Sequence, residues 1–246
     1  MNHRVALVTG GLGGIGTQIC RRLAGDGLRV IAADLATDAA RRQGFFDALA
    51  GLDVHVETVD VSSYDDCAAL VQRIEATHGP IDVLINGAGI TRDASFRKMT
   101  QEQWNAVLGV NLDSAFNLCK QVVDGMCERG RGRIVNISSI VGQAGAFGQV
   151  NYAAAKAGMH GLTMALAREV ARKGVTVNSI SPGYIQTAMT AAIPDEVRNQ
   201  MIANIPMGRM GQPDDIAQAV AFLCSDAASY LTGVNLPVNG GLFISF

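Results

Sequence analysis

Long apolar runs are missing from this sequence. None of its 246 residues belongs to an uninterrupted apolar stretch of about 18 residues, the length that a helix needs to cross a bilayer. The opening residues, MNHRVALVTG, contain an apolar run that is too short for a secretory signal peptide. These two absences argue against a membrane protein and predict a soluble protein of the cytoplasm.

Paired cysteines and an excess of basic charge are also missing. The five cysteines are odd in number and scattered, with no CxxC pair and no Cys/His cluster of metal-site spacing; they are Cys20, Cys67, Cys119, Cys127 and Cys224. We therefore expect reduced thiols and no metal site. The net charge of −2 and the pI near 6.1 argue against a nucleic-acid-binding protein.

Short β-rich runs alternate with helical patterns along the whole chain, without a linker or a repeat. This alternation predicts one domain, over residues 1–246, with a parallel sheet and helices on both faces. Strands are expected at Arg4–Thr9, Arg29–Asp34, Val54–Val59, Ile81–Asn86, Arg133–Ser138, Val175–Ser181 and Gly233–Val238. Helices are expected at Gly16–Gly25, Phe45–Ala50, Tyr64–His78, Gln101 to about Arg129, Asn151–Arg172 and Pro213–Cys224. The irregular segment 184–211 is predicted to be a substrate lid.

A glycine-rich stretch follows the first predicted strand and opens the first predicted helix. It reads TGGLGGIG, and its candidate cofactor contacts are Gly10, Gly13, Gly14, Ile15 and Gly16. Glycine lets the backbone turn tightly and approach a pyrophosphate, and the helix N-terminus offers unpaired N–H groups. A mobile loop is the alternative, but the strand before and the helix after favour dinucleotide binding.

A carboxylate ends the second predicted strand. Asp34 lies 18 residues after Gly16, where an acid accepts hydrogen bonds from the adenine ribose and repels a 2′-phosphate. This position favours NAD(H), with a solvated turn aspartate as the alternative. Arg41 and Arg42 follow closely in the sequence and keep NADP(H) possible.

Two further strand ends add candidate cofactor contacts. Asp60 and Val61 follow the third predicted strand, where they would contact adenine or simply form a turn. Small residues at the end of the fourth strand would let the cofactor pass close to the backbone; the stretch is Asn86, Gly87, Ala88 and Gly89.

The stretch from Asn136 to Lys156 contains a candidate acid–base group. Tyr152 and Lys156 are four residues apart, so they share one face of a helix. An ammonium beside a phenol favours the phenolate, which predicts a lowered pKa for Tyr152. Ser139 lies 13 residues before Tyr152 and could share one small oxygen ligand with it. A serine-protease interpretation of Ser139 is disfavoured, because no histidine lies in a triad-like setting.

As a set, these motifs resemble the short-chain dehydrogenase/reductase family. TGGLGGIG, Asp60, NGAG, Asn111, Ser139, YAAAK and SPGYIQT occur in the order and spacing of that family, over essentially the whole chain. The resemblance implies a doubly wound Rossmann fold with a seven-stranded parallel sheet, and hydride transfer between a nicotinamide and a carbonyl or alcohol carbon. One departure is Gly87, where the family commonly has an asparagine that helps to hold the central strands, so we expect looser packing there.

The resemblance also implies a role for each matching residue. Tyr152 would be the general acid in reduction, and Lys156 would lower its pKa and hold the nicotinamide ribose. Ser139 would orient the substrate oxygen. Asn111, in the middle of the long predicted helix, would hold a water in a proton relay to the lysine, or would be only a polar interface residue. Cofactor contacts after the sixth strand would come from Pro182, Gly183, Ile185 and Thr187. Thr187 and the Ile185 backbone would bind the carboxamide of the nicotinamide.

Within the family, the likeness is to the bacterial acetoacetyl-CoA reductases of polyhydroxyalkanoate synthesis. It rests on GITRDASFRKMT, GQAGAFGQVNYAAAKAGMHGLTMALA, SPGYI and NGGLF. It implies NAD(P)H-dependent reduction of acetoacetyl-CoA to (R)-3-hydroxybutanoyl-CoA. Beside Ser139 and Tyr152, the acyl-CoA site would be lined by Asp93, Lys98, Gln143, Phe147, Gln149 and Tyr184. For Phe147 and Tyr184 the alternative is ordinary loop packing.

Two other functions stay open at this point. The 3-oxoacyl-(acyl-carrier-protein) reductases of fatty-acid synthesis share GITRD and most of YAAAKAG, and an acidic carrier protein would need a basic patch such as Arg129, Arg131, Arg133 and Arg172. A non-catalytic NAD(H)-binding scaffold is disfavoured by the intact catalytic set. Family likeness and the apolar tail Leu242–Phe246 also predict a homotetramer.

Overall fold

One parallel sheet forms the centre of the protein. The computed structural model describes residues 4–35, 39–187, 190 and 194–244. Its seven strands lie in the order β3-β2-β1-β4-β5-β6-β7. They are β1 (Val5–Thr9), β2 (Arg29–Asp34), β3 (Val54–Thr58), β4 (Ile81–Asn86), β5 (Gly132–Ile137), β6 (Val175–Pro182) and β7 (Asn235–Val238). Every predicted strand is present, so the predicted single-domain α/β fold is confirmed.

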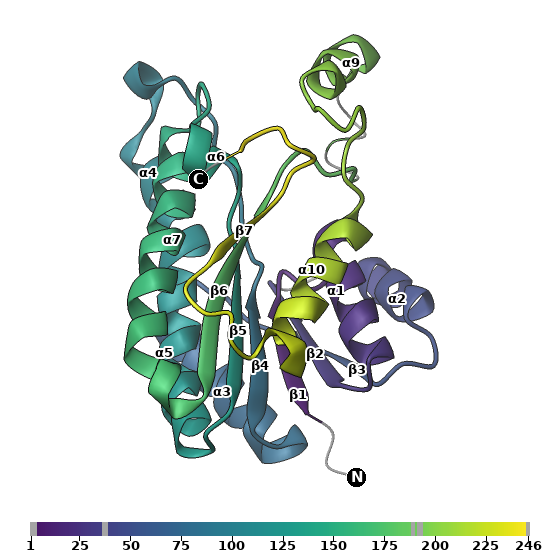
Figure 1. The fold of residues 1–246 in the computed structure, drawn as a ribbon, viewed down its shortest axis with the longest axis vertical. Coiled ribbons are helices and arrows are strands. Elements are labelled where there is room, and N and C mark those ends of the chain that lie inside the picture. Colours follow the sequence, from purple (N-terminus) through teal and green to yellow (C-terminus); the bar gives the residue numbers. More distant parts are fainter. Residues whose placement is uncertain (1–3, 36–38, 188–189, 191–193, 245–246) are drawn as a thin grey trace.

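Helices cover both faces of the sheet (Figure 1). One face carries α1 (Gly14–Gly25), α2 (Ala39–Ala48) and α10 (Pro213–Cys224). The other face carries α3 (Tyr64–His78), α5 (Ser114–Glu128) and α7 (Val150–Val170). Successive strand side chains point to opposite faces, so Val8 and Ile85 pack in the first layer while Leu7 and Leu84 pack in the second. Burial on both faces explains why these strands are continuous apolar runs.

Several helical segments differ from the expected pattern. α2 begins six residues before its predicted start. Its first six residues, AARRQG, bury no side chain, so the sequence has no apolar pattern there from which the helix could be predicted. The short helix α6 (Val141–Ala144) occupies a stretch that looks like a glycine-rich loop. α9 (Asp195–Ala203) lies inside the predicted irregular lid and buries none of its side chains, so it has no apolar periodicity. Within the predicted lid, residues 188–189 and 191–193 lie outside the part of the chain that the structure describes.

The long helix predicted from Gln101 is interrupted. It consists of α4 (Gln101–Leu108), a π-helical turn at Gly109–Asp113 and then α5. Such turns occur frequently at functional sites. The interruption falls on Asn111, one of the predicted catalytic residues.

The strand order reverses between β1 and β4, which is where ligands bind in doubly wound folds. The loops that follow these two strands come very close together. Gly10 has a φ of +65°, and a Cβ there would lie 2.8 Å from the carbonyl oxygen of Gly87. Only a residue without a side chain permits both this conformation and this approach.

The close packing of the glycine-rich loop yields a stability prediction. A Cβ on Gly16 would overlap the carbonyl oxygen of Gly10 and would lie 2.8 Å from the Cα of Gly11. Because backbone atoms cannot easily move aside, we expect Gly16→Ala to lower the free energy of unfolding by about 1–3 kcal/mol, measured by urea titration. Gly25→Ala, in the same helix, is the matched control, since its Cβ would meet nothing within 4 Å. Equal stabilities of the two variants would contradict this packing argument.

Candidate active site

The glycine-rich loop presents an open helix N-terminus. α1 begins after Gly13, and no described side chain caps it by a hydrogen bond. Its first-turn N–H groups and the positive end of its dipole therefore face outward. A Cβ on Gly14 would lie 3.3 Å from Thr187, so the segment after β6 reaches this helix start. The loop fits the pyrophosphate of a dinucleotide in both shape and charge.

Asp34 is tied to the glycine-rich loop. Its Oδ2 accepts a hydrogen bond from the N–H of Leu12 at 3.2 Å, and its Oδ1 accepts one from the N–H of Leu35 at 2.9 Å. Arg41 forms an ion pair with the same carboxylate at 3.4 Å. The Asp34 side chain is only 17% exposed, so it is not simply a solvated turn aspartate. The structure thus places a carboxylate and an arginine together at the end of β2.

The Asp60 carboxylate shapes a turn. Its Oδ1 accepts hydrogen bonds from the N–H of Ser62 at 2.9 Å and from the Ser62 hydroxyl at 2.6 Å. Val61 is buried, and its carbonyl accepts a hydrogen bond from Asn117 at 3.0 Å. One oxygen of Asp60 therefore has the turn role that was the alternative to an adenine contact.

The link between the central strands runs through Asn86, not through position 87. Asn86 donates to the Oδ1 of Asn136 at 2.8 Å, and Asn136 donates to Thr163 of α7 at 2.9 Å. The N–H of Gly87 donates to the Thr9 hydroxyl at 3.1 Å. The looser packing expected at Gly87 is therefore wrong, because a different asparagine makes the bridge and the glycine allows β1 and β4 to meet.

Ser139, Tyr152 and Lys156 come together from two elements. Ser139 follows the end of β5, and its hydroxyl acts on Tyr152 of α7, where it lowers the pKa of the phenol against the larger effect of burial. The Lys156 ammonium lies 5.6 Å from the centre of the Tyr152 ring and donates to the carbonyl of Ile137 at 2.8 Å. The predicted serine–tyrosine–lysine set is thus assembled at the carboxyl edge of the sheet.

Burial controls the protonation of this set. It raises the pKa of Tyr152 above its ordinary value, although the hydrogen bond with Ser139 acts in the opposite direction. The lowered pKa that we expected for Tyr152 is therefore wrong for this structure, because loss of hydration disfavours the phenolate. Burial also lowers the pKa of Lys156 to about 8. At neutral pH, Tyr152 carries its proton and Lys156 keeps most of its charge.

Asn111 lies beside this set, in the π-helical turn. It is buried, its Oδ1 accepts a hydrogen bond from the N–H of Ile90 at 2.8 Å, and its Nδ2 donates to the carbonyl of Ile90 at 2.9 Å. A Cβ on Gly89 would lie 3.5 Å from the Oδ1 of Asn111 and 3.6 Å from the Nζ of Lys156. The backbone of Ile90 thus uses one of the two Nδ2 hydrogens and one lone pair of Oδ1. Sequence reasoning missed the π-helical turn, which has no apolar signature.

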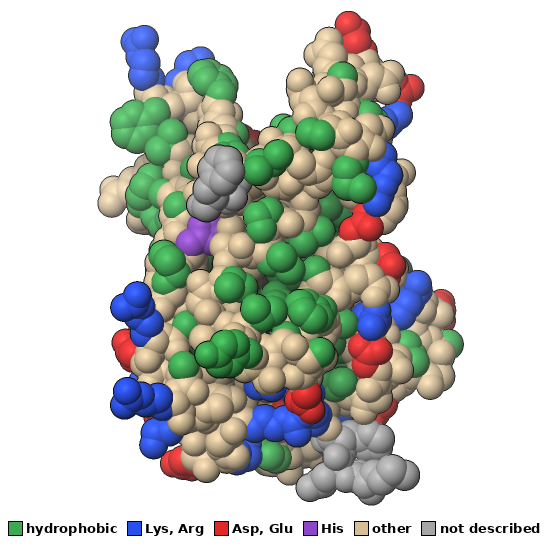
Figure 2. All heavy atoms as spheres, in the orientation of Figure 1, with side chains coloured by type: hydrophobic (Ala, Val, Ile, Leu, Met, Phe, Trp, Pro, Cys, Tyr) green, Lys and Arg blue, Asp and Glu red, His purple; other side chains and the backbone are tan. Residues whose placement is uncertain are grey.

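Two loops meet at one side of the cleft that Figure 2 shows at the top of the molecule. Gln149 donates to Asp93 at 3.0 Å, and the N–H of Ala94 donates to the carbonyl of Gly148 at 2.9 Å. Phe147 is 95% exposed at the tip of the second loop, so it is not a loop-packing residue. Lys98 is also exposed on this side, in a short 3₁₀ turn at Phe96–Lys98.

Gln143 and the segment after β6 complete the predicted substrate side. Gln143 lies on α6, and its Oε1 is buried without a hydrogen-bond partner among the described residues. Gly183 donates to the carbonyl of Val238 at 3.0 Å, and the carbonyl of Pro182 accepts from Ile140 at 3.0 Å. A cavity of about 360 Å³ lies between the segments that follow β6 and β7. Its lining includes Tyr184, Ile185, Met207, Asn239 and Gly240. Neither Ser139 nor Tyr152 lines this cavity, so it lies beside the catalytic set.

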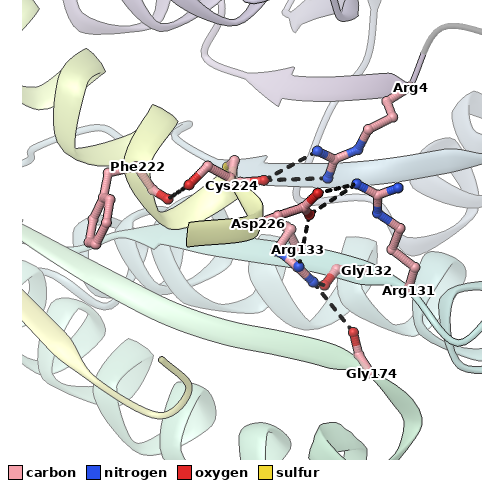
Figure 3. Close-up of polar contacts among 9 residues, drawn as sticks. Arg4, Arg131, Gly132, Arg133, Gly174, Phe222, Cys224 and Asp226 are labelled. Carbon is pink, nitrogen blue, oxygen red and sulfur yellow. Dashed lines mark hydrogen bonds and ion pairs between the residues drawn. The ribbon is translucent and has the colours of Figure 1, made fainter. Parts of the chain in front are cut away.

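The proposed basic docking patch is largely used inside the fold (Figure 3). Arg133 is buried, donates to the carbonyl of Gly132 at 2.9 Å and pairs with Asp226 at 3.5 Å. Arg131 pairs with the same aspartate at 3.1 Å, and Arg129 donates to the carbonyl of Ile81 at 2.7 Å. Arg131 and Arg133 lie at the start of β5, whereas Ser139 follows its end. Arg129 and Arg172 are nevertheless exposed, so part of the patch is accessible, although Arg172 lies after the end of α7 and Tyr152 near its start.

Other kinds of site are not evident in the part of the chain that the structure describes. All five cysteines are free thiols there. No three His, Cys, Asp or Glu side chains in the described ranges gather in an arrangement that could hold a metal. A search of the described helices finds none with the length and apolarity to cross a membrane.

Comparison with known proteins agrees with this geometry. The family model described as enoyl-(acyl carrier protein) reductase matches residues 10–243. The acetoacetyl-CoA reductase of Allochromatium vinosum is 61% identical over 243 residues, which cover 98% of this chain and 99% of that protein. The acetoacetyl-CoA reductase of Cupriavidus necator is 51% identical over 244 residues, or 98% of this chain and 99% of that protein. The 3-oxoacyl-(acyl-carrier-protein) reductase of Vibrio cholerae is 45% identical over 244 residues, or 99% of each chain. These matches show that the chain belongs to the short-chain dehydrogenase/reductase family.

Proposed function

We propose that this chain reduces acetoacetyl-CoA to (R)-3-hydroxybutanoyl-CoA with NAD(P)H, as in polyhydroxyalkanoate synthesis. The observation that carries the proposal is the gathering of Ser139, Tyr152 and Lys156, with the Lys156 ammonium 5.6 Å from the centre of the Tyr152 ring, at the edge where the glycine-rich loop lies. The acetoacetyl-CoA reductases reported above support the choice of substrate. The stereochemistry of the product rests on family resemblance alone.

The three side chains have complementary tasks in this reduction. Bound NAD(P)H supplies the hydride. Tyr152 carries its proton at neutral pH and donates it to the ketone oxygen, while the Ser139 hydroxyl donates a hydrogen bond to the same oxygen. The Lys156 ammonium stabilises the phenolate that remains and would hold the nicotinamide ribose. Asn111, in the π-helical turn, would hold the water that returns a proton to this set.

The nucleotide would lie across the carboxyl ends of β1, β2, β3, β4 and β6. The first-turn N–H groups of α1 would bind the pyrophosphate, and Asp34 would accept from the ribose hydroxyls. The backbone at Val61 would contact adenine. Asn86–Gly89 and Pro182–Thr187 would border the nicotinamide half. Asp34 favours NADH, and Arg41 is the residue through which NADPH could still bind.

Acyl-CoA is the proposed substrate, because the acetoacetyl-CoA reductases reported above are more similar to this chain than the carrier-protein reductase is. A carrier protein would need exposed positive charge; Arg131 and Arg133 pair with Asp226, whereas Arg129 and Arg172 are exposed. The exposed ring of Phe147 suits the apolar part of a CoA arm. The substrate site would comprise Asp93, Lys98, Ser139, Gln143, Phe147, Gln149, Tyr152 and Tyr184.

Comparing two thioesters tests the proposal. We expect kcat/KM for acetoacetyl-CoA to exceed that for acetoacetyl-(acyl-carrier-protein). We also expect Phe147→Ala to raise KM for acetoacetyl-CoA about tenfold, which corresponds to about 1.4 kcal/mol of lost binding. Tyr230→Ala is the matched control, because this fully exposed aromatic lies after the 3₁₀ turn at Asp226–Ala228 and outside the predicted site. A preference for the protein-bound substrate would favour the fatty-acid enzyme, and binding of nucleotide without turnover would favour the scaffold.

The homotetramer and the lid over residues 184–211 are further parts of this proposal. Exposed apolar side chains on α5, α7 and α10 are the surfaces that a tetramer would cover; they include Phe116, Met164 and Phe222. Covering them would remove apolar area from water and so favour assembly.

A further inference from the structure

A chain of hydrogen bonds runs behind the catalytic set, and His160 is at its centre. His160 lies one helical turn after Lys156 in α7. Its Nε2 is 3.2 Å from the hydroxyl of Ser138, the residue directly before Ser139. Its Nδ1 is 3.2 Å from the hydroxyl of Ser179 on β6. The imidazole therefore joins α7 to β6 and to the residue that directly follows β5.

The direction of each hydrogen bond follows from its neighbours. Ser138 donates its hydroxyl hydrogen to the carbonyl of Lys156 at 2.8 Å, so Ser138 must accept from the Nε2–H of His160. Nδ1 is then an acceptor, and the Ser179 hydroxyl can donate to it. The single hydroxyl hydrogen of Ser179 is shared between Nδ1 and the Oδ1 of Asn235 on β7, which accepts from Ser179 at 3.1 Å and from Ser181 at 2.9 Å. A neutral imidazole with its hydrogen on Nε2 satisfies this chain.

The charges around His160 agree with a neutral ring. Among the described residues, the charged group acting on it is Lys156, on its own helix. β5, β6 and β7 face the ring or its partners with Ser138, Ser179 and Asn235, which are hydroxyl and amide groups. Burial and the Lys156 ammonium hold the pKa of His160 below its ordinary value. His160 is therefore uncharged at neutral pH.

We propose that His160 is a positioning residue for the reduction, and that it acts by fixing Ser138 and the Lys156 carbonyl against β6. Ser139 follows the end of β5, whereas Tyr152 and Lys156 belong to α7, so their mutual placement depends on how these elements are joined. The Ser138 hydroxyl makes that join directly, and His160 holds the hydroxyl in the orientation that bonds the Lys156 carbonyl. Small displacements between reacting groups cost large factors in rate. The inference rests on the proposed function.

Kinetics of matched variants test this role. His160→Leu fills similar space without polar groups, and we expect it to lower kcat about tenfold with KM values for ketone and nucleotide within twofold of wild type. His160→Gln can donate at one end and accept at the other, so it is expected to recover most of the lost kcat. Ser179→Ala removes the donor to Nδ1 and should lower kcat. Thr176→Val in the same strand is the control, because the buried Thr176 hydroxyl has no hydrogen-bond partner among the described residues. Equal kcat for His160→Leu and wild type would overturn the proposal.

A measurement without substrate separates this inference from the proposed function. Nitrogen-15 NMR of histidine-labelled protein at pH 7, with His160→Gln used for assignment, should show the Nε2–H tautomer at His160. A doubly protonated ring or the Nδ1–H tautomer would overturn the hydrogen-bond chain. Failure of wild type to reduce acetoacetyl-CoA would instead overturn the proposed function. The NMR result would still decide whether the hydrogen-bond chain through His160 exists.

Discussion

Tyr152→Phe is expected to lower kcat for ketone reduction by about 10²- to 10⁴-fold, the range measured for loss of a general acid. The phenol is the group that bears a proton at neutral pH beside Ser139, because burial raises its pKa. Phenylalanine keeps the ring beside the Lys156 ammonium and removes only the hydroxyl. Steady-state assays with acetoacetyl-CoA at saturating nucleotide measure this effect, and fluorescence titration should show an unchanged nucleotide Kd.

Tyr64→Phe is the matched control for this variant. Tyr64 begins α3, is exposed and lies outside the predicted site, so the kcat of Tyr64→Phe should equal that of wild type.

The pH profile adds a second check, because Lys156 is charged below its pKa of about 8 and neutral above it. Reduction should therefore be level near pH 7 and fall as the pH rises through about 8, while Tyr152 stays protonated. A kcat for Tyr152→Phe within a few-fold of wild type would rule out Tyr152 as the acid.

Asp34→Ala is expected to shift the ratio of kcat/KM values by about tenfold to a hundredfold from NADH toward NADPH. Hydrogen bonds to a charged group contribute about 1.5–3 kcal/mol, and the variant loses those that Asp34 would make with the ribose. It also removes the negative charge that would repel a 2′-phosphate. Arg41, now paired with Asp34 at 3.4 Å, could then turn to that phosphate.

The ratio of the two nucleotides separates selection from loop damage. Asp34→Ala also takes an acceptor from the N–H of Leu12, and that loss affects both nucleotides alike. The double variant Asp34→Ala/Arg41→Ala should lose the gain with NADPH if the arginine binds the phosphate. An unchanged NADH/NADPH ratio in Asp34→Ala would show that another residue selects the nucleotide.

Local patterns in the sequence were sufficient for much of the fold. Strands such as β2 and β4, and helices α3 and α10, have the predicted bounds, because their apolar residues follow the period of the element. α9 was missed since it buries no side chain, and the π-helical turn around Asn111 was missed since it has no apolar period of its own. Periodicity reports contact with a core, so elements without that contact leave no pattern.

By itself, the sequence determined the family and the order of the site motifs. Spacing along a helix brings Tyr152 and Lys156 to one face, and parallel strands bring their carboxyl ends to one edge. Only the tertiary structure decided what surrounds these groups. Burial raises the pKa of Tyr152 where spacing alone predicted a lower one, and it places Arg133 inside the fold instead of on a docking patch. Protonation and exposure depend on neighbours that are distant in the chain, and packing alone determines which neighbours those are.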